Sequence, residues 1–150
     1  MAMSTAELHL TYVPDDQWLG ELTAVVRSGT FSGQGSAWFD RSSIRDTFVT
    51  PLRSFPLSST APPTIEGGTG SNEDFQCHLR VTVKPYNDRG ILLVQVDLVS
   101  DYRQEAVADA PNSVTIRFLT EYALVNTFAK DVDQVLDGTK ERAVLKGSAS

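Results

Sequence analysis

The sequence predicts an α+β fold, in which an antiparallel sheet of about six to seven strands has two amphipathic helices packed on one face. Three observations support this prediction. Apolar and polar residues alternate along several segments, which is the period of a strand with one buried face. Two other segments carry apolar residues at helical spacing, and turn sequences join neighbouring strands as hairpins. The expected order is β-β-β-α-β-β-β-α-β, in one domain over residues 1–150.

The first three strands are expected over residues 8–12, 18–28 and 31–39. Gly29-Thr30 is typical of a two-residue hairpin turn between the second and third of them. This turn would place Gly33 opposite Val26 and Gly35 opposite Ala24. We interpret the two glycines as letting the first helix lie close on the sheet.

A first helix is indicated by apolar residues at spacings of four, four and three: Ile44, Phe48, Leu52 and Phe55. Ser43 and Asp46 have the spacing of a capping box. Pro51 would remove a helical hydrogen bond, so the helix is expected to kink there or to end near Thr50 and restart. The following segment, 57–74, is rich in Ser, Thr, Pro and Gly, and we predict an irregular loop.

The clearest element is a hairpin over residues 75–99. Its alternation pairs Val81 with Val96 on one face and Arg80 with Asp97 on the other. A slip of one residue would move an apolar row to the wrong face, so this register is strongly specified. Residues 101–112 are expected to form a polar turn.

The last part of the chain predicts a strand, a helix and a short final strand. The strand covers 114–118, and the helix follows with Thr120 as its N-cap and Gly138 just beyond its end. Residues 141–146 would add the last strand.

Composition limits the classes of function. The chain has 150 residues, 13 basic and 19 acidic, with a net charge of −6. A nucleic-acid-binding protein would normally carry a basic footprint, so we expect no nucleic-acid partner. A negative charge suits a basic partner. The sequence shows neither a secretory signal nor a membrane-spanning stretch, so a soluble protein of the bacterial cytoplasm is expected, with no membrane contact.

The usual chemical motifs are weak. Gly33-Gln-Gly35 lies within a strand and Gly67-Gly68-Thr-Gly70 lies in a loop, so neither has the context of a nucleotide-binding turn. Cys77 and His78 are neighbours on a predicted strand and would point to opposite faces, with Cys77 towards the core. His9 is expected on the surface. We therefore predict no catalytic residue, no metal site and no cofactor.

Two polar groups remain as candidates. The acids Asp131, Asp133 and Asp137 lie near the end of the second helix, where they form either a solvated face or a contact surface. The better candidate is the polar face of the central strands, which could bind an anionic group or could simply be cross-strand pairing. Its members are Arg80, Thr82, Gln95, Asp97 and Arg117, with Trp38 on a separate strand as a possible interface anchor.

Several stretches together resemble a family of small uncharacterised bacterial domains with no assigned activity. They are Phe31-Ser-Gly-Gln-Gly-Ser-Ala-Trp-Phe39, Leu52-Arg-Ser-Phe-Pro56, Leu79-Arg-Val-Thr-Val-Lys-Pro-Tyr86 and Thr120-Glu-Tyr122. The resemblance implies an α+β fold but transfers no functional residue. Small acidic proteins of this kind are also similar in style to immunity proteins that neutralise bacterial toxins.

The leading hypothesis is a non-enzymatic binding or interaction module, with an immunity-like role as one form of it. The alternative is a small-molecule binder or enzyme that uses Arg80, Asp97 and Arg117, with the 57–74 loop as a lid. A ligand site should be a concave pocket with converging polar groups, whereas a protein-binding site should be a broad exposed patch. Association of two copies through an edge strand is a third hypothesis.

Overall fold

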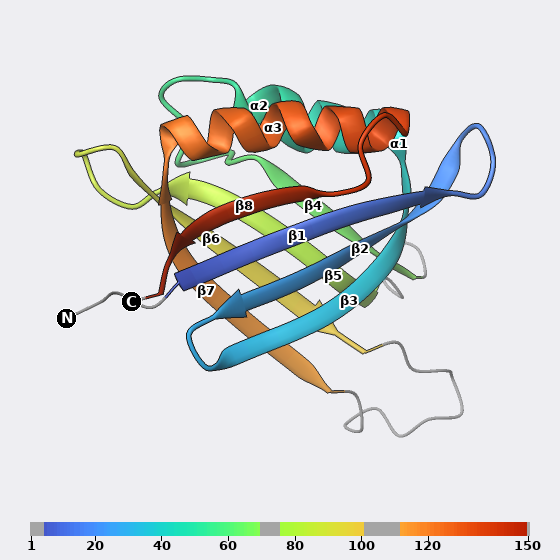
Figure 1. Cartoon of the computed structure of the whole chain (residues 1–150), viewed down its shortest axis with the longest axis horizontal. Helices are drawn as coiled ribbons and strands as arrows, with labels where there is room; N and C mark the ends of the chain where they lie inside the picture. Colours follow the sequence, from blue (N-terminus) through green and yellow to red (C-terminus); the bar gives the residue numbers. More distant parts are fainter. Residues whose placement is uncertain (1–4, 70–75, 101–111, 150) are drawn as a thin grey trace.

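The computed structural model describes residues 5–69, 76–100 and 112–149. It contains one antiparallel sheet of eight strands, in the order β3-β2-β1-β8-β7-β6-β5-β4 (Figure 1). The strands are β1 (Thr5–Pro14), β2 (Leu19–Ser28), β3 (Phe31–Asp40), β4 (Thr64–Thr69), β5 (Gln76–Pro85), β6 (Ile91–Val99), β7 (Ser113–Glu121) and β8 (Ala143–Ser148). The helical segments are α1 (Arg41–Ile44), η1 (Arg45–Val49) and α2 (Thr50–Leu52), which are continuous, and α3 (Tyr122–Asp137).

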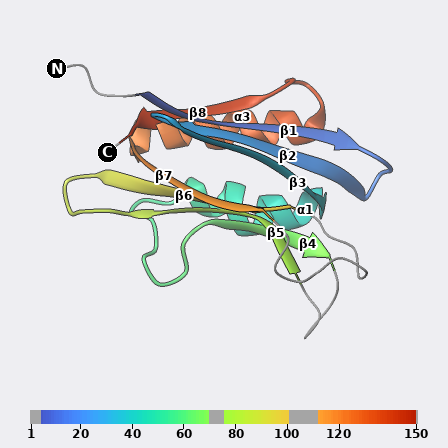
Figure 2. The same ribbon diagram turned by 90° about the horizontal axis from the view of Figure 1, so that it is seen from below.

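The sheet bends into two halves of four strands at the boundary between β8 and β7. Among the described residues, these two strands pair only at Leu119 and Ser148. Figure 2 shows the halves as two layers, with β1, β2, β3 and β8 in one and β4 to β7 in the other. We call them the first half-sheet, β3-β2-β1-β8, and the second half-sheet, β7-β6-β5-β4.

The two half-sheets are built to one plan. Each contains a three-stranded meander and one further strand, and a helical segment follows the third strand of the meander. The strand after each helix then pairs with the first strand of the other meander, so that β4 lies beside β5 and β8 lies beside β1. This exchange of final strands ties the two halves together.

The structure has one strand more than predicted. The additional strand is β4, which lies inside the segment 57–74 that the sequence predicts to be an irregular loop. With β4 included, the order is β-β-β-α-β-β-β-β-α-β, and the class, a mixed α+β fold with an antiparallel sheet, is confirmed. β4 has only six residues, Thr-Ile-Glu-Gly-Gly-Thr, and its pairs of threonines and glycines hide the alternation. Residues 70–74 of the predicted loop and 101–111 of the predicted turn lie outside the described residues.

The predicted strand registers are confirmed. Gly33 pairs with Val26 and Gly35 with Ala24, and Val81 pairs with Val96. The reason given for the glycines is wrong, however. A Cβ at Gly33 would lie 2.7 Å from Val114 Cγ1 and one at Gly35 would lie 3.0 Å from Leu98 Cδ2. The glycines thus let β3 lie close on the second half-sheet, where the prediction had placed a helix.

The first helical segment starts earlier than predicted and bends around its proline. Its N-cap is Asp40, whose carboxylate accepts hydrogen bonds from the Ser42 N–H at 2.8 Å and the Ser42 hydroxyl at 2.6 Å, so the predicted Ser43 capping box is wrong. The chain widens into the π-helical turn η1 before Pro51, and the Thr50 N–H reaches back to the Arg45 carbonyl. A wider turn of this kind accommodates a residue that cannot donate a hydrogen bond.

The second helix, α3, begins at Tyr122 with Glu121 at the N-cap position. As predicted, it ends before Gly138, which adopts a φ of 83°. The predicted N-cap, Thr120, instead lies buried in β7, and its hydroxyl donates to the Lys146 carbonyl at 2.8 Å. Phe128 of α3 packs edge-on against Phe48 of η1, with ring centroids 6.2 Å apart. Both helical segments and the inner sides of the strands enclose a single core.

Candidate interaction surface

The polar face predicted as a site lies on the outer side of the second half-sheet and forms a hydrogen-bonded ladder. Asp97 accepts a hydrogen bond from the Thr115 hydroxyl at 2.6 Å and one from the Gln95 amide at 3.2 Å. Gln95 in turn accepts a hydrogen bond from Arg117 Nε at 3.1 Å. Thr82 lies opposite Gln95, as the register predicts.

The ladder satisfies its own polar groups. Arg80 lies opposite Asp97 in the register, but its Nε donates to Glu66 of β4 at 2.7 Å. This hydrogen bond raises the pKa of the Arg80 guanidinium above its ordinary value. Arg80 is already ion-paired with Glu66, and Arg117 donates its Nε to Gln95, so the set has less capacity for an anionic ligand than its composition suggests. Of the two interpretations, cross-strand pairing on a solvent-exposed surface therefore fits the geometry better than binding of an anionic ligand.

Trp38 does not belong to this ladder. It lies on β3, at the far end of the strand order from β5, and pairs with Glu21 of β2. Glu21 in turn pairs with Val13 of β1, so these three side chains form a row across the outer side of the first half-sheet. Trp38 is 52% exposed and Val13 is 65% exposed.

Two further exposed apolar residues lie at the end of these strands where β1 turns into β2. Trp18, in the turn between β1 and β2, is 64% exposed, and Leu19, the first residue of β2, is also exposed. We call Val13, Trp18, Leu19 and Trp38 the tryptophan surface. Large exposed apolar groups gathered in one place are typical of contact sites, and tryptophan is enriched among residues that dominate binding energy.

The rim of the tryptophan surface is acidic. It consists of Asp15, Asp16 and Asp40, with Arg41 as the nearby base, and Glu21 adds a further acid between Val13 and Trp38. The Asp16 carboxylate accepts hydrogen bonds from the N–H groups of Trp18 and Leu19, both at 2.7 Å, which shapes the turn that presents Trp18.

Hydrogen bonds also keep this rim charged. The N–H groups of Leu19 and Trp18 lower the pKa of the Asp16 carboxyl below its ordinary value. The Ser42 hydroxyl and N–H do the same to the pKa of Asp40. Both carboxylates therefore stay ionised at neutral and mildly acidic pH, so the rim presents negative charge next to the apolar groups.

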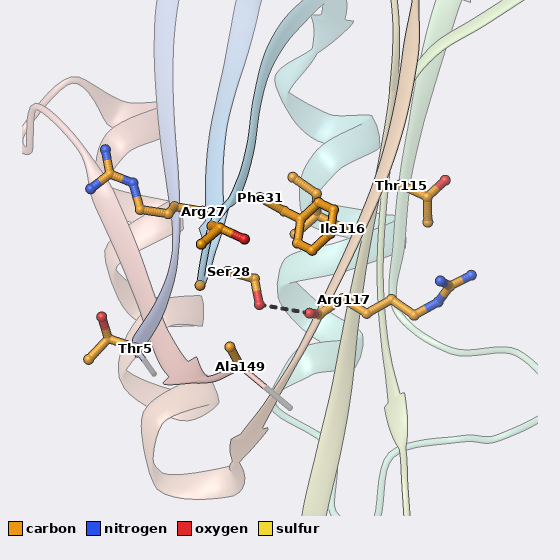
Figure 3. A pocket seen from close by; sticks show the side chains of 10 residues that line it. Thr5, Arg27, Ser28, Phe31, Thr115, Ile116, Arg117 and Ala149 are labelled. Atoms are coloured by element: carbon orange, nitrogen blue, oxygen red, sulfur yellow. Dashed lines mark hydrogen bonds between the residues drawn. The ribbon is translucent and has the colours of Figure 1, made fainter. Parts of the chain in front are cut away.

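A hollow of about 780 Å³ opens at the end of the β2–β3 hairpin, where the two half-sheets meet (Figure 3). Ser28 bridges the halves there, since its hydroxyl donates to the Arg117 carbonyl at 3.1 Å. Phe31 and Ile116 lie between Arg27 and Arg117, whose guanidinium groups point away from one another. Arg80 and Asp97 do not line this hollow. The predicted site of Arg80, Asp97 and Arg117 is therefore not brought together in it.

The other candidate groups have structural partners. Arg45 of η1 donates to Asp133 at 2.8 Å and also to Asp137, and Lys140 pairs with Asp131 at 2.9 Å. These three acids therefore join α3 to its neighbours, which favours a structural role over the contact surface that was the second interpretation.

Cys77 and His78 do not occupy the predicted faces of β5. A bulge falls where Gly67 pairs with Leu79 and Gly68 pairs with Cys77, so that His78 becomes an extra residue on β5. His78 is consequently buried next to buried Leu79, whereas Cys77 is half-buried. Burial raises the pKa of the Cys77 thiol, which is the opposite of an activated nucleophile. The described ranges contain no group of three His, Cys, Asp or Glu residues placed to hold a metal ion.

These features define the class of protein as an antiparallel α+β domain. The polar side chains on the outer side of one half-sheet hydrogen-bond to one another, and the other half-sheet carries an apolar surface bordered by acids. Comparison of the chain with protein-family models, with curated proteins and with solved structures finds no match. The resemblance to a family of small bacterial domains therefore stays a prediction. No helix within the described part of the chain is long and apolar enough to cross a membrane.

Proposed function

We propose that this protein is a non-enzymatic module that binds another protein through the tryptophan surface. The observation that carries the proposal is the exposure of Val13, Trp18, Leu19 and Trp38 at one end of the first half-sheet. Burying such side chains against a partner would remove apolar area from water at about 25 cal/mol per Å². The polar ladder of the second half-sheet offers no comparable gain.

The acidic rim indicates the charge of the partner. Asp15, Asp16, Glu21 and Asp40 border the apolar groups, and the whole chain has a net charge of −6. A basic protein surface would complement this rim, because opposite potentials speed encounter and disfavour partners of the wrong charge. The finer proposal is an immunity-like role, in which this surface covers a basic protein and blocks its action.

The test is capture of a partner from lysate of the source organism with the tagged protein as bait. Trp38→Ala removes a large exposed side chain of the surface, and Tyr86→Ala, which removes an aromatic side chain that is 59% exposed on the other half of the molecule, is the matched control. We expect one basic protein in near-equal amount with the wild type and with Tyr86→Ala, and its loss with Trp38→Ala. Raising the salt concentration should weaken capture, because exposed charges are screened.

Three results would contradict the proposal. The Trp38→Ala variant could still capture the partner, the captured protein could be acidic, or the folded wild-type bait could capture no protein. The immunity-like form has its own test. The captured partner, expressed alone, should inhibit growth, and co-expression of the wild type but not of Trp38→Ala should restore growth. A partner without effect on growth would leave a binding module and remove the immunity-like role.

A further inference from the structure

The opposite end of the first half-sheet carries a second hollow, of about 440 Å³, on the outer side of the strands. Glu7, His9 and Thr11 of β1 contribute to it, together with Val25 and Arg27 of β2 and with Arg142, which directly precedes β8. The strand pairing explains why these groups converge, since Glu7 lies opposite Arg27 and His9 lies opposite Val25.

The charge of this hollow is opposite to that of the rest of the molecule. In a chain with 19 acidic and 13 basic residues, two arginines share one hollow with a single carboxylate. Within the described residues neither Arg27 nor Arg142 has an ion-pair partner, whereas Arg45 and Arg80 both do. The one acid, Glu7, has its Oε2 at 3.3 Å from His9 Nε2, so it is engaged by a neighbour on its own strand.

Lys146 adds a further positive charge, because it lies opposite Glu7 on the strand to the other side. Two guanidinium groups and one carboxylate line this hollow, which leaves an excess of positive charge that a bound anion would offset. Guanidinium groups also present paired N–H donors that match the oxygens of a phosphate or carboxylate. Arg27 also borders the hollow at the hairpin end, where its guanidinium group points away from that of Arg117 (Figure 3).

We propose that the hollow bounded by Arg27 and Arg142 binds the phosphate group of a small phosphomonoester. A phosphomonoester carries a charge near −2 at neutral pH, which matches two guanidinium groups better than a single carboxylate does. The Thr11 hydroxyl and the His9 ring supply further hydrogen-bonding groups at the wall. Exposed Val25 offers an apolar contact for the remainder of the ligand. This site is separate from the tryptophan surface and does not depend on the proposed partner.

The test is an NMR titration of the full chain with inorganic phosphate at constant ionic strength, with acetate as the comparison anion. We expect saturable shifts confined to the amides of Glu7, His9, Thr11, Val25 and Arg27, and weaker shifts with acetate. Arg27→Gln and Arg142→Gln should each weaken binding about tenfold, since each removes one charge-assisted partner. Arg89→Gln, on the turn between β5 and β6, is the matched control and should leave the affinity unchanged.

Shifts that spread over the whole protein, that match those of acetate, or that persist in both arginine variants would overturn the proposal. Self-association of the protein as the cause of the shifts would also overturn it, and a concentration series without phosphate detects that case. A second titration with glucose 6-phosphate shows whether an esterified phosphate enters as well as the free ion, and its exclusion would contradict the monoester assignment. Trp38→Ala should bind phosphate like the wild type, so failure of this site and failure of the protein-binding surface are distinguishable.

Discussion

The two half-sheets have the same arrangement of strands and helices, but the side chains on their outer sides differ. In the second half-sheet, Arg80, Asp97 and Arg117 are all joined by hydrogen bonds to neighbours on the same sheet. In the first half-sheet, Trp38 and Val13 are more than half exposed and flank Glu21. The sequence makes the ladder the more conspicuous candidate, because its residues are charged and converge on one face.

The comparison teaches that convergence of polar groups is a weak sign of a binding site when the groups can satisfy one another. A ladder of paired side chains gains little from a ligand, because binding would exchange existing hydrogen bonds for new ones. Exposed apolar groups gain from any partner that covers them. The availability of the groups therefore distinguishes the two faces better than their chemical type does.

The largest loss of stability is expected at the joint between the half-sheets, where β7 meets β8. A Cβ at Gly147 would lie 2.1 Å from the Leu119 carbonyl oxygen, a backbone atom that cannot move aside alone. We expect Gly147→Ala to lower the free energy of unfolding by about 3 kcal/mol, because overpacking forces the backbone to shift. Urea unfolding measures this loss, with Lys146→Ala, an exposed change in the same strand, as the control. Equal stability of the two variants would show that β7 and β8 are not held this closely.

The packing of β3 on the second half-sheet should be the next most sensitive feature. Gly33→Ala places a methyl group 2.7 Å from Val114 Cγ1, a side-chain atom that can partly give way. The expected loss of unfolding free energy is about 1 to 2 kcal/mol, smaller than at Gly147. Ser36→Ala, on the exposed side of the same strand, should change it by less than about 0.5 kcal/mol. A Gly33→Ala variant as stable as Ser36→Ala would contradict close contact between the two layers.

The N-cap at Asp40 predicts a pH dependence. Hydrogen bonds from Ser42 lower the pKa of Asp40 in the folded protein, so its stabilisation is fully present above the ordinary carboxyl pKa and is lost as pH falls through the lower folded pKa. Asp40→Ala should therefore lower the melting temperature at neutral pH. The difference from the wild type should shrink below about pH 4. A difference that grows towards acidic pH would have the wrong sign for this cap.

The smallest effects should come from the two outer faces themselves. Asp97→Ala removes the acceptor for Thr115 and Gln95 and should cost under about 1 kcal/mol of stability, as for other exposed cross-strand pairs. Trp38→Ser should change the stability by less than about 0.5 kcal/mol while increasing solubility, since Trp38 is exposed in the free protein. Chemical unfolding and precipitation assays measure both. A large loss with Trp38→Ser would mean that Trp38 supports the fold.

Much of the fold could be predicted, because period-two alternation specifies both faces of a strand. The register of Val81 with Val96 follows from alternation, and that of Val26 with Gly33 follows from the hairpin turn. The prediction missed β4, whose six residues have a threonine at each end and two adjacent glycines, and with it the partner of Arg80, Glu66. The bulge at His78 could also not be predicted from the local sequence pattern, because it arises from the pairing of β5 with β4.

The site was less predictable, because exposure depends on long-range packing. The sequence predicts Trp38 as an anchor from its position on a strand, but its pattern does not link Val13, Trp18 and Leu19 to Trp38. The signal that could have found Val13 was the short connection between the first two strands. An antiparallel pairing over that turn places Val13 opposite Glu21 and thus in the row of Trp38. The boundary between β7 and β8, where Gly147 lies close to the Leu119 carbonyl, separates this row from Arg80 and has no local signature in the sequence.

The most direct test of the central claim is amide hydrogen exchange of the protein, alone and bound to the partner that it captures. The account predicts slower exchange confined to residues 13–21 and 34–40, which carry the tryptophan surface and its rim. The β5–β6 hairpin, with its self-satisfied ladder, should exchange at the same rate in both states. Protection of residues 79–97 without protection at Trp38 would show that the contact surface lies on the other half-sheet.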